Sequence, residues 1–143
     1  MSPRLMPYAP VDAMPPGRPM IVRSADGTLL HTEVFGPENG YPIVLAHGIT
    51  CAIRVWANQI NDLANDYRVV AYDHRGHGRS GVPHRRGNYG LDFLAADLDA
   101  VLAATLAPGE RAVIAGHSMA ASRSCRGPSA TRAACSSAPT RSG

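Results

Sequence analysis

The sequence contains 143 residues, of which 45% are hydrophobic and 17% charged, and its net charge is +3. This length and composition provide for one globular domain with a hydrophobic core and argue against a second domain. The charge is unevenly placed: residues 1–120 hold ten Arg and eleven acidic residues, whereas residues 121–143 hold four Arg and no acidic residue. The folded part therefore has no basic excess, which argues against a nucleic-acid partner.

The N-terminal part of the sequence predicts a flexible lead followed by a β-hairpin. Residues 1–17 contain many Pro and show no hydrophobic periodicity, so we expect regular structure to begin near Arg18. Residues 20–23 and 28–35 have the composition of β-strands, and the step Asp26-Gly27 lies between them. Because Asp-Gly between two such runs is typical of a tight turn, the chain is expected to open with an antiparallel pair.

The rest of the domain alternates buried strands with helices. The runs 43–46, 69–72 and 112–115 are apolar at every position, as strands covered on both faces must be. Between them, apolar residues recur at helical spacing over 56–63 and over 91–102. The predicted fold class is therefore α/β, with the antiparallel hairpin leading into a parallel sheet with flanking helices and right-handed crossovers.

The C-terminal segment differs from the rest in composition. Residues 121–143 contain no Val, Ile, Leu, Met or aromatic residue, and six Ser, five Ala and four Arg make up most of them. Such a segment cannot bury enough apolar area to offset the entropy lost on ordering. We therefore expect a domain over residues 18–120 and a disordered Arg/Ser/Ala-rich tail over 121–143.

Cysteine usage and the absence of hydrophobic targeting segments indicate the cellular setting. The three Cys residues are odd in number and show no C-x-x-C spacing, which disfavours a disulfide framework. The N-terminus has no continuous apolar stretch like that of a secretory signal, and no uncharged apolar run approaches the roughly 18 residues of a membrane span. We expect a cytoplasmic protein with no membrane partner and leave its oligomeric state open.

Two short motifs directly follow predicted buried strands. In Gly116-His117-Ser118-Met119-Ala120, a Ser stands at a sharp strand-to-helix turn, where its hydroxyl is lifted above the sheet; the usual pattern G-x-S-x-G has Ala120 in place of the last Gly. The second motif, His47-Gly48-Ile49-Thr50, follows the first buried strand and can bring a backbone amide to the same sheet edge. The amides of Ile49 and Met119 are the natural oxyanion donors. Taken alone, either string also fits an ordinary turn.

A third motif, residues 73–80, follows the second buried strand. Its two His residues and Asp73 raise the possibility of a metal site, and its Gly and Arg residues that of a phosphate site. The spacing matches no zinc signature and no phosphate-binding loop, so we expect a hydrogen-bonded loop that braces neighbouring strand ends, with no metal and no organic cofactor. The residues expected to support the site structurally are His47, Gly48, Asp73, Arg75, Gly76, Gly78, Ser80 and Gly116.

Together these loops resemble the α/β-hydrolase family of the serine-nucleophile type over about residues 20–120. The resemblance is carried, in family order, by H-G-x-T at 47–50, Trp56, Y-D-H-R-G-H-G-R-S at 72–80 and the G-H-S-M elbow. It implies Ser118 as nucleophile, an oxyanion hole from the Ile49 and Met119 amides, and a small-molecule substrate. Relatives that open epoxides or haloalkanes use Asp as the nucleophile, so Ser118 favours ester, thioester, amide or carbon–carbon hydrolysis, or the cofactor-free haloperoxidase group.

The sequence departs from this family after the elbow. Family members carry the acid and the His of the triad after the nucleophile, but no Asp, Glu or His follows Ser118. The upstream His47, His74, His77 and His84 stand at positions that the family does not use for its base. We therefore expect the 143 residues to be inactive as an esterase. The alternatives are a non-catalytic fragment or binding module whose basic tail binds acidic partners, and a dimer in which the partner supplies the His.

We interpret the tail as the product of a shifted reading frame. The change in composition falls at Met119-Ala120, within the elbow. If one G was lost from an ATG-GGC codon junction, the restored frame can read G-H-S-M-G-G-I-S-V-M-S-W-A-V-R-Y-P-R-R-V-L-L-G with suitable third bases. This reading recovers the missing Gly, an amphipathic helix and the next buried strand. The alternative is a divergent fragment with a genuine Arg/Ser extension.

Overall fold

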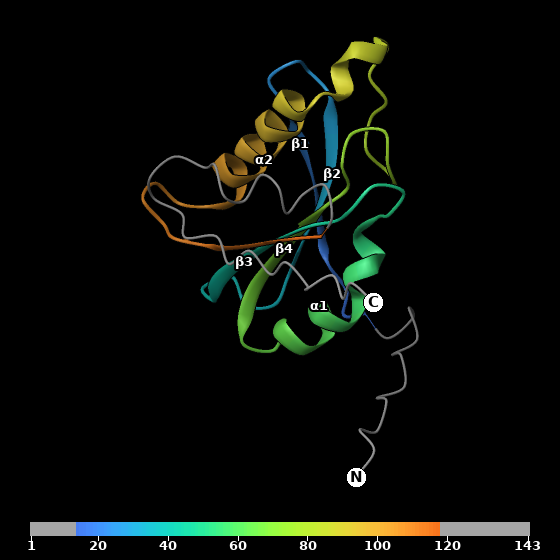
Figure 1. The fold of residues 1–143 in the computed structure, drawn as a ribbon. Helices are drawn as coiled ribbons and strands as arrows, with labels where there is room; N and C mark the ends of the chain where they lie inside the picture. Colours follow the sequence, from blue (N-terminus) through green and yellow to red (C-terminus); the bar gives the residue numbers. More distant parts are fainter. Residues whose placement is uncertain (1–13, 118–143) are drawn as a thin grey trace, which may run out of the picture.

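The computed structural model describes residues 14–117, which form one five-stranded sheet with helices on both faces (Figure 1). The predicted Ser118 and Met119 and the tail lie outside the described residues. The strands are β1 (Arg18–Arg23), β2 (Leu29–Phe35), β3 (Tyr41–Ala46), β4 (Tyr67–Tyr72) and β5 (Val113–Gly116). The helices are η2 (Ile53–Trp56), α1 (Ala57–Leu63), η3 (Arg86–Tyr89) and α2 (Leu91–Thr105).

The strand order is β1-β2-β4-β3-β5. β1 pairs antiparallel with β2, and β2 pairs antiparallel with β4. β3 lies between β4 and β5 and is parallel to both. The predicted fold class, a hairpin leading into a parallel sheet, is therefore confirmed. The short helix η3 was not predicted, because residues 86–89 show no hydrophobic periodicity.

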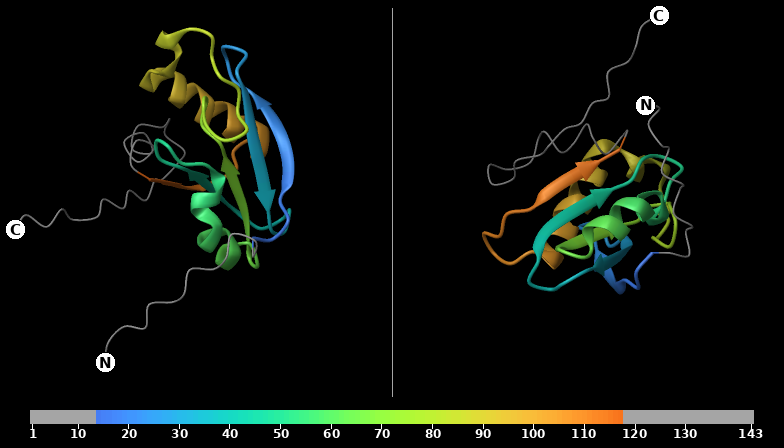
Figure 2. Two further views of the ribbon diagram at one scale, coloured as in Figure 1. Left: turned by 90° about the vertical axis from the view of Figure 1, so that its right-hand side faces the viewer. Right: turned by 90° about the horizontal axis from the view of Figure 1, so that it is seen from below.

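Two hydrophobic clusters explain why the central strands are apolar at every position. Val44 and Val70 belong to a cluster that includes Val101 of α2, whereas Leu45 and Val69 belong to one that includes Ile60 of α1. Figure 2 shows the two helices on opposite faces of the sheet. Since successive side chains of a strand point to opposite faces, a strand covered by helices on both sides must be apolar throughout.

Element boundaries differ from the predicted ones by a few residues. β3 begins at Tyr41 rather than at residue 43, and α2 continues to Thr105 rather than ending at residue 102. Backbone hydrogen bonding extends past the apolar positions from which the ranges were predicted. Within residues 14–117, no helix combines the length and the hydrophobicity needed to cross a membrane.

Candidate functional site

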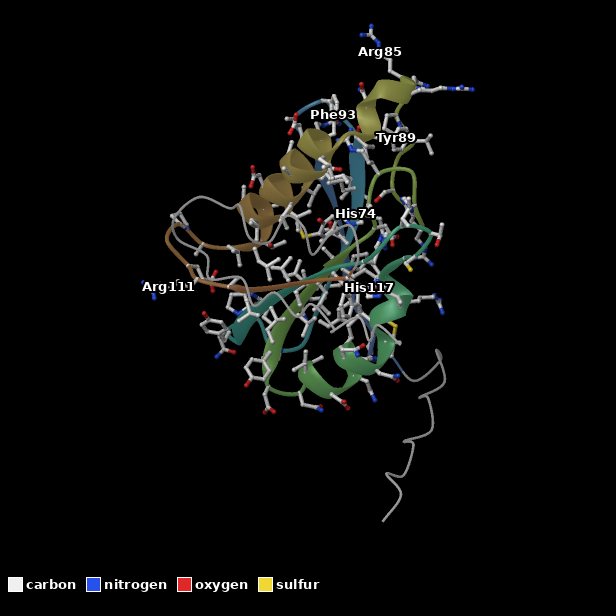
Figure 3. The ribbon with its side chains drawn as sticks, viewed as in Figure 1. His74, Arg85, Tyr89, Phe93, Arg111 and His117 are labelled. Atoms are coloured by element: carbon white, nitrogen blue, oxygen red, sulfur yellow. The ribbon has the colours of Figure 1, made fainter. Side chains whose placement is uncertain are left out.

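The three parallel strands β3, β4 and β5 end side by side at one edge of the sheet. Ala46, the last residue of β3, pairs with Tyr72 of β4 on one side and with Gly116 of β5 on the other. The His117 amide continues this alignment by donating to the Ala46 carbonyl at 3.1 Å. The loops that begin at His47 and Asp73 therefore start at the same edge as His117, the last described residue, and Figure 3 labels His74 and His117 there.

The first loop begins with a four-residue turn over residues 48–51. The Cys51 amide donates to the Gly48 carbonyl at 3.3 Å, and Thr50, the third residue of the turn, has a φ of 63°. This left-handed conformation costs a β-branched residue roughly 1–2 kcal/mol. Ile49 is 58% exposed, and its amide has no hydrogen-bond partner within residues 14–117. The turn thus leaves one backbone donor unused at the sheet edge.

His47 and His74 lock the first loop to the second by a reciprocal pair of hydrogen bonds. The His74 amide donates to His47 Nε2 at 2.9 Å, and His74 Nε2 donates to the His47 carbonyl at 2.8 Å. His47 Nδ1 donates to the Gly48 carbonyl at 2.7 Å. Because His47 Nε2 accepts an amide hydrogen while Nδ1 donates, the His47 ring must be neutral. Burial lowers the pKa of both histidines, that of His74 to about 4.

His77 makes a further link between the same two loops. The Thr50 amide donates to His77 Nε2 at 3.1 Å, and His77 Nδ1 donates to the Arg75 carbonyl at 3.0 Å. The ring centroids of His47 and His77 are 5.4 Å apart. His47 and His77 therefore use both ring nitrogens to hold backbone, and the remaining nitrogen of His74, Nδ1, is buried. None of the three is arranged to serve as a general base for an external group.

Asp73 organises the second loop by accepting backbone amides. Its carboxylate is buried and accepts from the Ile53 amide at 2.8 Å and the Arg79 amide at 3.0 Å. The Ser80 hydroxyl donates to the Asp73 carbonyl at 2.5 Å and accepts the His31 amide at 2.9 Å, which joins the loop to β2. At Gly78, with φ of 49°, a Cβ would lie 2.2 Å from the Asp73 carboxylate. Only glycine fits there.

Arg75 connects the second loop to the hairpin and to α2. Its guanidinium donates to Asp97 from Nε at 2.7 Å and from Nη2 at 2.5 Å, and to Asp26 at 2.9 Å. Arg75 and Asp97 are both buried, and the guanidinium lies 5.0 Å from the centre of the Phe93 ring. The hydrogen bond from Arg75 holds the pKa of Asp26 at about 2. That the loop over residues 73–80 supports the strand ends remains a prediction. The contacts of Asp73, Ser80 and Arg75 are its physical basis.

The sequence did not indicate the partners in this network. Asp26, Asn88 and Asp97 all hydrogen-bond Arg75 from elements far along the chain. One feature of the sequence could have indicated a partner for Arg75. Asp97 stands between Leu94 and Val101 on the buried face of α2, and a buried acidic residue needs a cation beside it. Within the described residues, no three His, Cys, Asp or Glu side chains are grouped to hold a metal ion.

A cavity of about 380 Å³ lies beside the second loop, on the side of the N-terminal residues 14–17. His31 and Glu33 line it and form an ion pair at 2.8 Å between Nε2 and Oε1. Arg54 and Arg79 line the same cavity. Because its walls carry both signs of charge, the cavity favours no simple charge class of ligand.

We expect the stability of the chain to fall as the pH is lowered from 6.5 toward 4. The folded state resists protonation of His74 until about pH 4, whereas the unfolded state takes up this proton near pH 6.5. The loss amounts to up to about 3 kcal/mol for His74, and His47 adds to it in the same direction. Urea denaturation at a series of pH values measures this dependence. His74→Gln is expected to flatten it, whereas the exposed His84→Gln is expected to leave it unchanged.

The comparisons with known proteins agree with this architecture. The family model of the alpha/beta hydrolase fold matches residues 41–125. This range covers more than half of the chain and includes the loops at the carboxyl edge of the sheet. The chain therefore belongs to the alpha/beta hydrolase family.

Individual relatives within this family carry different activities. The chain is 40% identical over 98 residues to a non-heme chloroperoxidase of Streptomyces lividans, covering 68% of this chain and 34% of that protein. It is 38% identical over 82 residues to epoxide hydrolase 4 of Mus musculus, covering 57% of this chain and 23% of that protein. An esterase of a Rhodococcus species is 37% identical with a TM-score of 0.65, covering 72% of this chain and 37% of that one. The chain spans about a third or less of the length of these curated relatives.

Proposed function

We propose that the intact protein is a cytoplasmic serine hydrolase that acts on an ester-like small-molecule acyl substrate through Ser118. The observation that carries this proposal is the strand register, in which Ala46 pairs with both Tyr72 and Gly116. Ser118 follows Gly116 by two residues in the sequence, and the Ile49 amide at this edge has no partner among the described residues. The half-buried free thiol of Cys51 is in keeping with a reducing compartment.

The chemistry proposed is acyl transfer. The Ser118 hydroxyl attacks the carbonyl carbon of the substrate, and the negative charge that develops on the carbonyl oxygen is stabilised by the Ile49 and Met119 amides. A general base must take the hydroxyl proton and pass it to the leaving alcohol as the ester bond breaks, and water, activated by the same base, must then release the acid from Ser118. An acidic side chain must orient that base. The similarity to epoxide hydrolases does not change the proposed nucleophile. Family members that open epoxides carry an Asp at the elbow position, whereas this chain carries Ser118 there.

The base and the acid are proposed to lie in the frame-restored continuation of the gene. No Asp, Glu or His follows Ser118 in the 143 residues. His47, His74 and His77 are hydrogen-bonded to the backbone of the two loops. A Ser without its base is a weak nucleophile. We therefore expect the 143-residue chain to show no ester hydrolysis above the buffer rate.

The test compares two proteins on a p-nitrophenyl ester. One is the 143-residue chain, and the other is expressed from the resequenced gene with the frame after Met119 restored. Turnover by the second protein alone is the expected result. Turnover by the 143-residue chain would place the base elsewhere, and inactivity of a folded, frame-restored protein toward esters, thioesters and amides would contradict the proposed function.

Ile49→Pro tests the oxyanion donor. Proline removes the amide hydrogen, and the second position of a turn accepts proline well, so the 48–51 turn is expected to persist. In the frame-restored protein, kcat is expected to fall by about 10²–10³-fold, the usual effect of losing one oxyanion donor. Ile49→Ala, which keeps the amide, is the matched control and is expected to stay near the parent value. Equal losses in both variants would mean that the side chain matters and the amide does not.

A further inference from the structure

His77 contacts the turn that carries the proposed oxyanion donor, although it belongs to a different loop. Its Nε2 accepts the Thr50 amide at 3.1 Å. We propose that His77 is a positioning residue: its neutral ring holds Thr50 in the left-handed conformation and so keeps the neighbouring Ile49 amide facing the site. This inference rests on the proposed function, because it explains how that donor is held in place.

Thr50 needs support from outside the turn. Its φ of 63° is the only positive value at a non-glycine position among the described residues. β-Branched residues rarely adopt this conformation without support from the surrounding structure. The bond that closes the turn, from the Cys51 amide to the Gly48 carbonyl, is long at 3.3 Å. Within residues 14–117, the contact with His77 is the only hydrogen bond that the structure gives to Thr50.

The position and tautomer of His77 are set by its other nitrogen. Nδ1 donates to the Arg75 carbonyl at 3.0 Å, so the proton of the neutral ring lies on Nδ1 and leaves Nε2 free to accept. Arg75 is in turn fixed by Asp97 of α2. The turn at residues 48–51 is thereby connected, through His77 and Arg75, to a buried ion pair.

Protonation of His77 would break this contact. With a proton on each nitrogen, Nε2–H and the Thr50 amide would be two donors facing each other. Two ionisable rings pack against His77 within the described residues: that of His47, with centroids 5.4 Å apart, and that of His74, at 6.4 Å. His47 is neutral because its Nε2 accepts an amide, and burial lowers the pKa of His74 to about 4. The conformation of Thr50 should therefore follow the protonation state of His77 itself.

The experiment uses nitrogen-15 NMR of the full 143-residue chain and involves no catalysis. Long-range proton–nitrogen spectra of the His77 ring are expected to show the tautomer protonated at Nδ1. The Thr50 amide is expected to exchange with solvent at least about tenfold more slowly than the Ile49 amide, once intrinsic rates are divided out. On acidification, the Thr50 amide shift is expected to change with the same midpoint as the His77 ring. A Thr50 shift that is independent of the ring would overturn the proposal.

Two variants separate the ring nitrogen from the bulk of the side chain. His77→Phe removes the acceptor and is expected to speed Thr50 exchange about tenfold or more and to move its amide–Hα coupling away from the left-handed value. His77→Gln offers a side-chain oxygen near the position of Nε2 and is expected to restore most of the protection. His84→Phe, on an exposed loop, is the matched control and is expected to change neither.

The outcomes distinguish this inference from the proposed function. Loss of protection in His77→Gln equal to that in His77→Phe would overturn the positioning role. A chain without dispersed amide resonances would overturn it together with the fold on which it depends. If His77→Phe alone fails to fold, the pH titration of the unmodified chain decides the matter. A protein that hydrolyses no ester but shows the Thr50–His77 coupling would contradict the proposed function and retain the inference.

Discussion

Replacement of Ser118 by Ala in the frame-restored protein is expected to lower kcat/KM for a p-nitrophenyl ester by at least about 10³-fold. The hydroxyl is the proposed nucleophile, and loss of a catalytic serine leaves only the rate enhancement due to substrate binding and the oxyanion donors. The melting temperature is expected to stay within a few degrees of the parent value, because one oxygen atom is removed from a residue proposed to lie at the surface of the site.

His84→Ala is the control for this measurement. His84 is exposed, and none of the contacts described above involves it. The variant is expected to keep the activity of the parent protein. If His84→Ala is as inactive as Ser118→Ala, then the base is supplied by a residue that the family does not use for it. If Ser118→Ala keeps its activity, the hydrolysis has another nucleophile.

The parallel part of the fold could be predicted because burial on two faces has an unambiguous sequence signature. β3 and β4 lie between α1 and α2, and no position in the interior of either strand can be polar without a partner. The Asp26-Gly27 step likewise marked the first hairpin, since Gly27 adopts a φ of 87° that other residues avoid. The buried strands and the first hairpin could both be predicted because residues that are close together in the sequence determine them.

The hydrogen bonds at the sheet edge could not be predicted in the same way. The amide of His74 meets Nε2 of His47 across 27 residues of sequence, and Thr50 meets His77 across the same separation. Which ring nitrogen of His47 or His77 accepts a hydrogen bond depends on how the two loops lie relative to each other. The register of β3 with β4 sets that relative position. The motifs indicated that these loops would meet, but the roles of the individual atoms follow only from the folded structure.

Arg75 illustrates the same limit. Its motif, rich in Gly and Arg, predicts a loop that braces strand ends, and the same composition is also compatible with a phosphate ligand. Its guanidinium is almost fully enclosed, with 1% of the residue exposed, and its donors are used by Asp97, Asp26 and the Asn88 carbonyl. A guanidinium occupied in this way has no donor left for a phosphate. The role of a cation in such a motif depends on acidic residues that are distant in sequence.

Arg75→Ala is expected to reduce the free energy of unfolding by about 3–5 kcal/mol, because it leaves the Asp97 carboxylate buried without a partner. Typical domains are stable by only about 5–15 kcal/mol, so this variant should be close to unfolding at room temperature. Urea denaturation of the 143-residue chain, followed by the fluorescence of its single Trp, measures the change. Arg111→Ala, an exposed position labelled away from this network in Figure 3, is the matched control and should change stability by no more than about 0.5 kcal/mol.

A second substitution separates the loss of the ion pair from the creation of an unpaired charge. Asp97→Leu alone is expected to destabilise by a similar amount, since it leaves the Arg75 guanidinium with only Asp26 as a charged partner. Arg75→Met combined with Asp97→Leu is expected to recover much of the loss, because a buried pair can be replaced by apolar side chains at little cost. If the double variant is as unstable as the sum of the single variants, the contacts to Asp26 and Asn88, rather than the pair with Asp97, are what join the second loop to the hairpin.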